Sequence, residues 1–142
     1  MRKLFVPVDS SDNALRALEH AIRLAKENGP IELIVATAHE AAFDNPRTLA
    51  YLPKEKLERI LKEHSESILS PAIEIATSAG VTFTTEILTG PVPQAIVKRA
   101  EELDCDGIVM GTRGMGAIGN LLMGSVATKV IHLTKLPVTL VK

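Results

Sequence analysis

The sequence predicts an α/β fold in which a five-stranded parallel sheet is covered by helices on both faces. Apolar runs typical of buried strands alternate along the chain with segments whose apolar residues recur at helical spacing. Most of the strand-like runs are continuously apolar, as expected for parallel strands that helices cover on both sides, whereas residues 81–88 nearly alternate. A length of 142 residues suits one domain, so we expect residues 1–142 to form a single doubly wound, three-layer domain.

Each predicted element is bounded by residues that start or stop regular structure. The predicted strands cover residues 4–8, 31–38, 81–88, 107–110 and 138–141. The predicted helices cover residues 13–27, 53–79 and about 91–103, and a further helix begins at 125. Capping residues at 9–12 precede the first helix, and Gly80 can end the second. We expect Pro71 to kink or split that long helix, and His64 to lie on its apolar face.

Composition excludes several classes of function. The chain has no Trp, one Tyr and three Phe, which leaves few rings for stacking nucleic-acid bases. A formal net charge of −1 gives no overall attraction to nucleic acid or to an anionic membrane. No apolar run approaches the roughly 20 residues needed to span a bilayer, and the first residues do not resemble a secretory leader. We therefore expect a cytoplasmic protein that binds no nucleic acid and does not insert into a membrane.

The distribution of charge indicates where an anion could bind. All 17 acidic residues lie before residue 107. The remaining segment, 107–142, contains four basic residues, which are Arg113, Lys129, Lys135 and Lys142. An anionic ligand would meet the least repulsion in this last quarter of the chain.

A glycine-rich segment lies inside this acid-free quarter. Five glycines fall between positions 111 and 124, after a predicted strand and before a predicted helix. Glycine permits positive φ and allows a ligand to approach the backbone closely. Free N–H groups in such a loop can form an anion-binding nest, and the start of the helix after Ser125 adds partial positive charge. The guanidinium of Arg113 supplies a fixed positive fork.

Three nucleotide-binding motifs compete for this segment. Residues 114–119 match the dinucleotide fingerprint G-x-G-x-x-G, but no acid follows to bind the ribose, so this interpretation is rejected. Residues 119–125 approach a P-loop, but Ser125 stands where that motif requires lysine. The third pattern, G-x2-G-x9-G-[S/T], is matched in full by Gly111, Gly114, Gly124 and Ser125. It resembles the motif of the ATP-binding branch of the universal stress protein family.

The resemblance covers nearly the whole chain and implies a specific sheet order. It includes residues 6–11, 108–111 and 136–141. The family implies the strand order 3-2-1-4-5, in which the first and fourth strands are neighbours and their crossovers leave on opposite faces. Asp9 and Gly111 end these two strands, and open α/β sheets bind ligands beyond such a reversal point.

The resemblance also implies a ligand and a set of contacts. The expected ligand is ATP, or AMP or ADP, with Mg²⁺ or Mn²⁺. The phosphate and ribose cradle would consist of Gly111, Arg113, Gly114, Gly124, Ser125 and Val126. Pro7, Thr37 and Met110 would line the adenine or ribose, and Asp9 would lie near the ribose and phosphates and contact the metal ion. The family further implies a homodimer through the C-terminal edge strand, residues 138–142.

The sequence assigns no catalytic residue. Ser125 has no evident histidine partner, and Asp9 is not one of a pair of carboxylates. Asp104 and Asp106 flank Cys105 and should raise its pKa, which disfavours a reactive thiolate. We favour a regulatory ATP-binding protein of the stress response in which any hydrolysis is slow. A slow ATPase or nucleotidyl-transferring enzyme, and an interaction module that binds no nucleotide, remain as alternatives.

Overall fold

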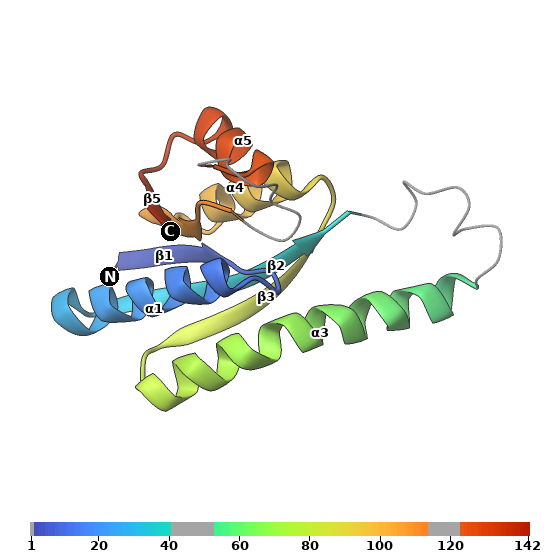
Figure 1. The fold of residues 1–142 in the computed structure, drawn as a ribbon, viewed down its shortest axis with the longest axis horizontal. Coiled ribbons are helices and arrows are strands. Elements are labelled where there is room, and N and C mark those ends of the chain that lie inside the picture. Colours follow the sequence, from blue (N-terminus) through green and yellow to red (C-terminus); the bar gives the residue numbers. More distant parts are fainter. Residues whose placement is uncertain (1, 41–52, 114–122) are drawn as a thin grey trace.

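The fold is a five-stranded parallel sheet with helices on both faces, seen in a computed structural model that describes residues 2–40, 53–113 and 123–142 (Figure 1). The strands are β1 (Arg2–Pro7), β2 (Ile31–His39), β3 (Phe83–Thr89), β4 (Gly107–Gly111) and β5 (Val138–Val141). The helices are α1 (Asp12–Asn28), α3 (Lys54–Ala79), α4 (Val92–Glu102) and α5 (Ser125–Leu133). The strand order is β3-β2-β1-β4-β5, which confirms the predicted order.

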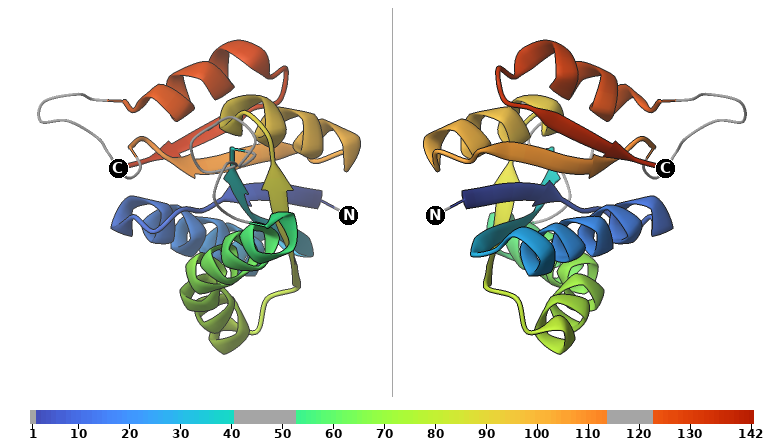
Figure 2. Two further views of the ribbon diagram at one scale, coloured as in Figure 1. Left: turned by 90° about the vertical axis from the view of Figure 1, so that its right-hand side faces the viewer. Right: turned by 90° about the vertical axis from the view of Figure 1, so that its left-hand side faces the viewer.

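Two hydrophobic clusters lie on opposite faces of the sheet. Figure 2 shows α1 and α3 on one face and α4 and α5 on the other. Successive side chains of a strand point to opposite faces, so Val6 and Val35 join the cluster under α1 and α3. Phe5, Ile34 and Ile108 join the cluster under α4 and α5. Because helices cover both faces, the central strands are largely apolar along their buried length, as the sequence predicts.

The sheet places its reversal point between β1 and β4. β1 pairs in parallel with β2 on one side and with β4 on the other, where Leu4 faces Gly107 and Phe5 faces Ile108. The chain leaves β1 into α1 on one face and leaves β4 toward α5 on the opposite face. The carboxyl ends of these two strands therefore border the position where a ligand is expected in an open α/β sheet.

The long helix α3 differs from the prediction in two respects. It is one continuous helix with Pro71 inside it, so Pro71 does not split the helix, which was one of the two predicted outcomes. Pro71 is exposed, and the carbonyl of Ser67 that it deprives of a partner lies on the solvent side, where water can bind it. His64 is exposed and does not lie on the apolar face; Ser65 is buried there instead.

Candidate functional site

The candidate site is formed by the loop after β1, the end of β4 and the first turn of α5. These three segments lie at the same edge of the sheet because the carboxyl ends of parallel strands meet there. The N–H of Gly124 donates to the carbonyl of Thr112 at 2.6 Å, which joins the two ends of the glycine-rich segment. The N–H of Thr112 donates in turn to Val141 of β5 at 2.9 Å. Thr112 is buried and links the end of β4 to β5 and to the start of α5, a role that the sequence analysis missed.

The backbone N–H of Gly124 differs from its predicted role in the phosphate cradle. Its hydrogen bond to Thr112 means that this N–H is not available to a phosphate in this structure. The intrahelical ladder of α5 begins with the N–H of Thr128, which donates to the carbonyl of Gly124 at 3.1 Å. The amides of Ser125, Val126 and the residue after them have no acceptor within the helix, by helix geometry. The start of α5, and not Gly124 itself, therefore offers the donors for an anion.

Asp9 lies at the carboxyl end of β1 and orients the start of α1. Its Oδ1 accepts the N–H of Ser11 at 2.9 Å and a short hydrogen bond from the Ser11 hydroxyl. Ser11 is the N-cap of α1, and its Oγ accepts the N–H of Ala14 at 3.1 Å. The helix cap is therefore Ser11, one of the capping residues at 9–12, and not Asp9. Asp9 is half-buried and lies beside the reversal point, as expected for a carboxylate near a bound ligand.

Asn13 is a second residue of this region that the sequence analysis missed. It is 8% exposed, and its Oδ1 accepts the backbone N–H of Arg113 at 3.0 Å. A Cβ atom added to Gly111 would overlap this oxygen and lie 3.0 Å from Cγ of Asn13. Gly111 therefore lacks a side chain because α1 packs directly against the end of β4. The sequence shows only that a polar residue stands in the first turn of the predicted helix, and its burial is seen only in the structure.

The other predicted site residues differ in exposure and in the face of the sheet on which they lie. Met110 and Thr37 are 5% and 3% exposed, and Pro7 is half-buried. Met110 packs in the cluster under α4 and α5, whereas alternation along β2 directs Thr37 to the opposite face. Arg113 and Ser125 are exposed, and Gly114 lies outside the described residues. The described structure thus brings Asp9, Gly111, Arg113, Gly124, Ser125 and Val126 to the carboxyl ends of the strands. Pro7, Thr37 and Met110 also lie near the ends of their strands, but Thr37 is on the face opposite Met110.

The side chains available as metal ligands also limit how a metal ion could be held. Within the residues that the structure describes, no group of three or more His, Cys, Asp or Glu side chains is placed to hold a metal ion. Asp9 could supply one carboxylate. Mg²⁺ is commonly bound by one or two carboxylates together with substrate phosphates. The residues present therefore fit a cation that arrives with a polyphosphate better than an ion held by protein ligands alone.

Cys105 is a structural residue. It is 4% exposed in the cluster under α4 and α5. Burial, assisted by the charge of Asp106, raises the pKa of the thiol to about 11. The predicted direction of the pKa shift is confirmed, but burial contributes more than the flanking acids. A thiol with this pKa is almost entirely protonated near neutral pH, so it is a poor nucleophile.

A histidine at the end of β2 makes folding stability depend on pH. Nδ1 of His39 lies 3.2 Å from Oγ of Ser65, which is 1% exposed on α3. Burial and the nearby His64 lower the pKa of His39 below its ordinary value of 6.5. The folded state therefore binds this proton less readily than the unfolded state does. Its contribution to stability is present above pH 6.5 and is lost as the pH falls through the lowered pKa of the folded protein.

We predict that the free energy of unfolding, measured by urea titration, decreases from pH 7 to pH 5 in the parent protein. The substitution His39→Gln keeps a hydrogen-bonding group opposite Ser65 and removes the titration, so it should flatten this decrease. His132→Gln, at an exposed position on α5, is the matched control and should leave the pH dependence unchanged. If His39→Gln keeps the pH dependence of the parent, protonation of His39 is not the cause of the loss of stability at low pH.

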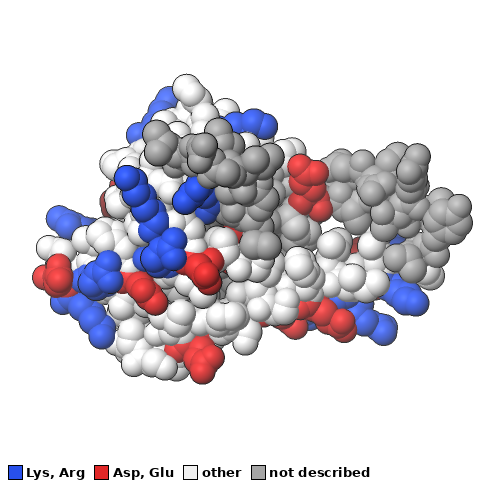
Figure 3. Space-filling model, in the orientation of Figure 1, with Lys and Arg blue, Asp and Glu red and all other residues white. Residues whose placement is uncertain are grey.

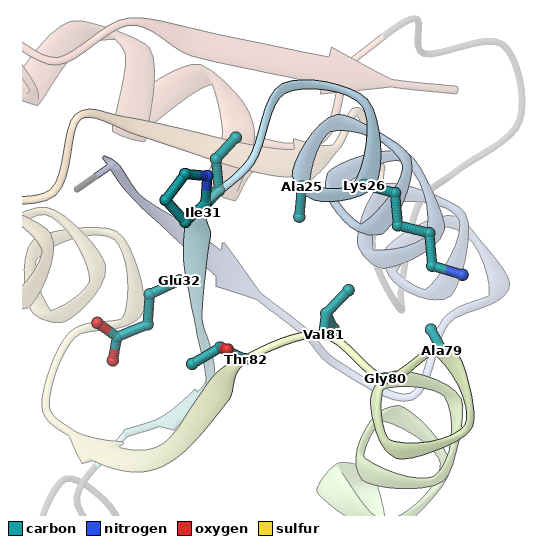
Figure 4. Close-up of a pocket in the computed structure, with 9 residues that line it drawn as sticks. Ala25, Lys26, Ile31, Glu32, Ala79, Gly80, Val81 and Thr82 are labelled. Carbon is teal, nitrogen blue, oxygen red and sulfur yellow. The ribbon is translucent and has the colours of Figure 1, made fainter.

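A cleft of about 270 Å³ lies at the opposite edge of the sheet, beside the start of β2 and the end of α3 (Figure 4). It is lined by Ala25, Lys26, Pro30, Ile31, Glu32, Ala79, Gly80, Val81 and Thr82. Figure 4 shows that the ammonium group of Lys26 and the carboxylate of Glu32 point away from each other. Without polar groups that converge on one point, this cleft does not have the character of a ligand site.

The fold defines an open, doubly wound α/β protein whose reversal point lies between β1 and β4. The chain belongs to the universal stress protein family, because the model of that family matches residues 1–142. Universal stress protein MJ0531 of Methanocaldococcus jannaschii is 34% identical over 99% of this chain and 82% of its own length. Universal stress protein YxiE of Bacillus subtilis is 31% identical over 99% of this chain and 98% of its own.

Solved structures share the fold and some hold adenine nucleotides. The hypothetical protein MJ0577 is similar with a TM-score of 0.85 and 26% identity, over 99% of this chain and 95% of its own. A universal stress protein in complex with cAMP gives a TM-score of 0.70 at 28% identity, and the match covers 99% of this chain and 96% of that protein. The universal stress protein of Archaeoglobus fulgidus in complex with dAMP gives 0.70 at 26% identity, over 100% and 98%.

Proposed function

We propose that this protein binds ATP, or another adenine nucleotide, as a regulatory universal stress protein. One observation carries the proposal: the hydrogen bond between Gly124 and Thr112 brings the first turn of α5 to the end of β4, at the reversal point beside Asp9. The helix start offers backbone donors and partial positive charge to phosphates. The complexes of related proteins with cAMP and dAMP support an adenine nucleotide as the ligand.

Within this proposal, Mg²⁺ or Mn²⁺ accompanies the nucleotide. The metal ion would neutralise phosphate charge and be held mainly by phosphate oxygens, with the Asp9 carboxylate as its protein ligand. The described part of the site offers no nucleophile beside a general base, so we propose that the protein retains the nucleotide and hydrolyses it slowly. A retained nucleotide suits a signal that changes the stability or the partners of the protein.

Calorimetric titration of the purified protein with ATP and MgCl₂ tests the proposed function. A ligand that binds only the folded state at 100 times its Kd adds about 2.7 kcal/mol of stability. For a domain of this size, that addition raises Tm by roughly 8 °C. Mass spectrometry of the freshly purified, denatured protein should also detect a bound adenine nucleotide. Absence of both binding heat and thermal shift at millimolar ATP or AMP would overturn the proposal.

We also propose a cytoplasmic homodimer that forms through β5. None of the helices in the described residues has the length and apolarity to cross a membrane. The sheet order places β5 at an edge. Pro137 and Val141 accept hydrogen bonds from Ile108 and Thr112 on the β4 side. Backbone groups alternate along a strand, so the N–H and carbonyl of Val138 and Leu140 point to the free edge, where a second copy can pair.

We predict that Leu140→Pro prevents dimer formation, because proline removes the N–H at the free edge and leaves the hydrogen bonds to β4 in place. Leu140→Ala is the matched control, since it loses similar packing of a half-buried side chain but keeps the N–H. Light scattering coupled to size exclusion should give a monomer for the proline variant and a dimer for the alanine variant. A folded proline variant that remains dimeric would refute this interface.

A further inference from the structure

One polar side chain links α1 to the backbone just after the end of β4. Asn13 is buried in the first turn of α1, and its Oδ1 accepts the backbone N–H of Arg113 at 3.0 Å. The two residues are 100 positions apart in the chain. The buried side chain thus accepts a hydrogen bond from the backbone that immediately follows Thr112, and the carbonyl of Thr112 accepts the amide of Gly124.

These hydrogen bonds form a chain across the reversal point of the sheet. Asp9 holds Ser11, and Ser11 caps α1. The cap fixes the first turn of α1 and therefore the place of Asn13, which holds the backbone at Arg113. The separation between the Asp9 loop and the start of the glycine-rich segment is thus set through Asn13. Backbone donors act on phosphate only when they are held at hydrogen-bonding distance.

The chemical type of the side chain is also informative. Asn13 lies at the positive end of the α1 dipole, where a carboxylate would stabilise the helix. Asn accepts the same hydrogen bond without a negative charge. Beside a site for a polyanion, a neutral acceptor avoids the repulsion that Asp would cause.

We infer that Asn13 is a positioning residue for the phosphates of the bound nucleotide: it fixes the Arg113 backbone against α1 and does so without adding negative charge. This inference rests on the proposed function, because it concerns the affinity of the same site for polyphosphate. It goes further because it assigns to a residue of α1 the part of the affinity that depends on the phosphates, which is the difference between ATP and adenosine binding.

Three variants separate positioning from general stability. Asn13→Ala removes the acceptor. Asn13→Asp keeps the acceptor and adds a charge. Asn28→Ala is the matched control, because Asn28 is exposed at the far end of the same helix and donates only to the carbonyl of Leu24 among the described contacts. For each protein, calorimetry gives the Kd for ATP with MgCl₂ and for adenosine, and hydrogen exchange by NMR reports the protection of the Arg113 amide.

The inference predicts different behaviour for each variant. Asn13→Ala should lose amide protection at Arg113 and bind ATP about tenfold more weakly, with the Kd for adenosine within about twofold of the parent. Asn13→Asp should keep the amide protection and still bind ATP about tenfold more weakly, with the deficit shrinking at high salt. Asn28→Ala should match the parent in all three measurements.

The outcomes are distinguishable. If the parent binds ATP and both Asn13 variants keep the parent ratio of ATP to adenosine affinity, Asn13 is structural and the inference is overturned, while the proposed function stands. If ATP and adenosine affinity fall together in Asn13→Ala, the residue does not act on the phosphates and the inference is again overturned. If the parent itself does not bind ATP, the proposed function fails, and the role of Asn13 in phosphate binding fails with it.

Discussion

Gly124→Val is expected to weaken ATP binding by at least about 100-fold while the apo protein remains folded. Gly124 has φ −77° and ψ 168°, a conformation that residues with side chains adopt without strain. Its N–H can still donate to Thr112, and its carbonyl can still accept from Thr128. The two methyl groups of valine would instead occupy space at the start of α5, where the proposed phosphates must approach the helix amides. A loss of this size corresponds to about 2.7 kcal/mol of binding free energy.

Calorimetry measures the loss, and circular dichroism with thermal melting checks the fold. Gly124→Ala is the graded control, because a single methyl group should reduce affinity less than valine does. Ser125→Ala is a second comparison, since it keeps the backbone donors and removes only the hydroxyl of an exposed side chain. A Gly124→Val protein that binds ATP as tightly as the parent would show that the ligand does not approach this residue.

The strands and their order were predictable because their physical signals are local or are fixed by family resemblance. Continuous apolar runs identify strands buried on both faces, and the predicted ends lie within about two residues of the observed ends. The face of α3 was harder to predict. A pattern of apolar residues favoured His64, but the helix buries Ser65, whose hydroxyl lies 3.2 Å from His39 of β2. The partner of a buried polar residue cannot be read from spacing along one helix.

The position of the candidate site was predictable, but its internal hydrogen bonds were not. The glycine motif and Asp9 both point to the carboxyl ends of β1 and β4, where the structure places Asp9 and the described motif residues Gly111 and Gly124. The contact of Asn13 with Arg113 spans 100 residues and depends on how α1 packs against β4. No pattern within the glycine-rich segment contains that information. Thr112 was missed for the same reason, since its partners lie in β5 and at the start of α5.

The reason for the glycine at position 111 also emerged only in three dimensions. Sequence reasoning assigned the loop glycines to positive φ or to close approach of a ligand. Gly80 and Gly90 are the described glycines with positive φ, and both lie away from the motif. Gly111 instead leaves room for Asn13, and this explanation can be tested by measuring how the two residues depend on each other.

Gly111→Ala is expected to destabilise the protein by about 2–4 kcal/mol, because the added Cβ would overlap Oδ1 of Asn13 and lie 3.2 Å from the Asn13 backbone carbon. Relief of the overlap requires the Asn13 side chain to move, and that movement breaks its hydrogen bond to Arg113. For a domain of this size, Tm should fall by roughly 6–12 °C. Urea titration of the parent, of Gly111→Ala, of Asn13→Ala and of the double variant that combines them measures the effect.

The double variant with Asn13→Ala distinguishes a local collision from a general loss of packing. Removing the Asn13 carboxamide takes away the closest obstacle, so the double variant should be more stable than the sum of the single effects by about 1–2 kcal/mol. It should not regain full stability, since the backbone contact at 3.2 Å remains. Gly107→Ala on the same strand is the matched control, because its Cβ would meet Pro137 at 3.3 Å and Leu4 at 3.5 Å and not Asn13. Additive effects for positions 111 and 13 would mean that α1 does not determine the glycine at the end of β4.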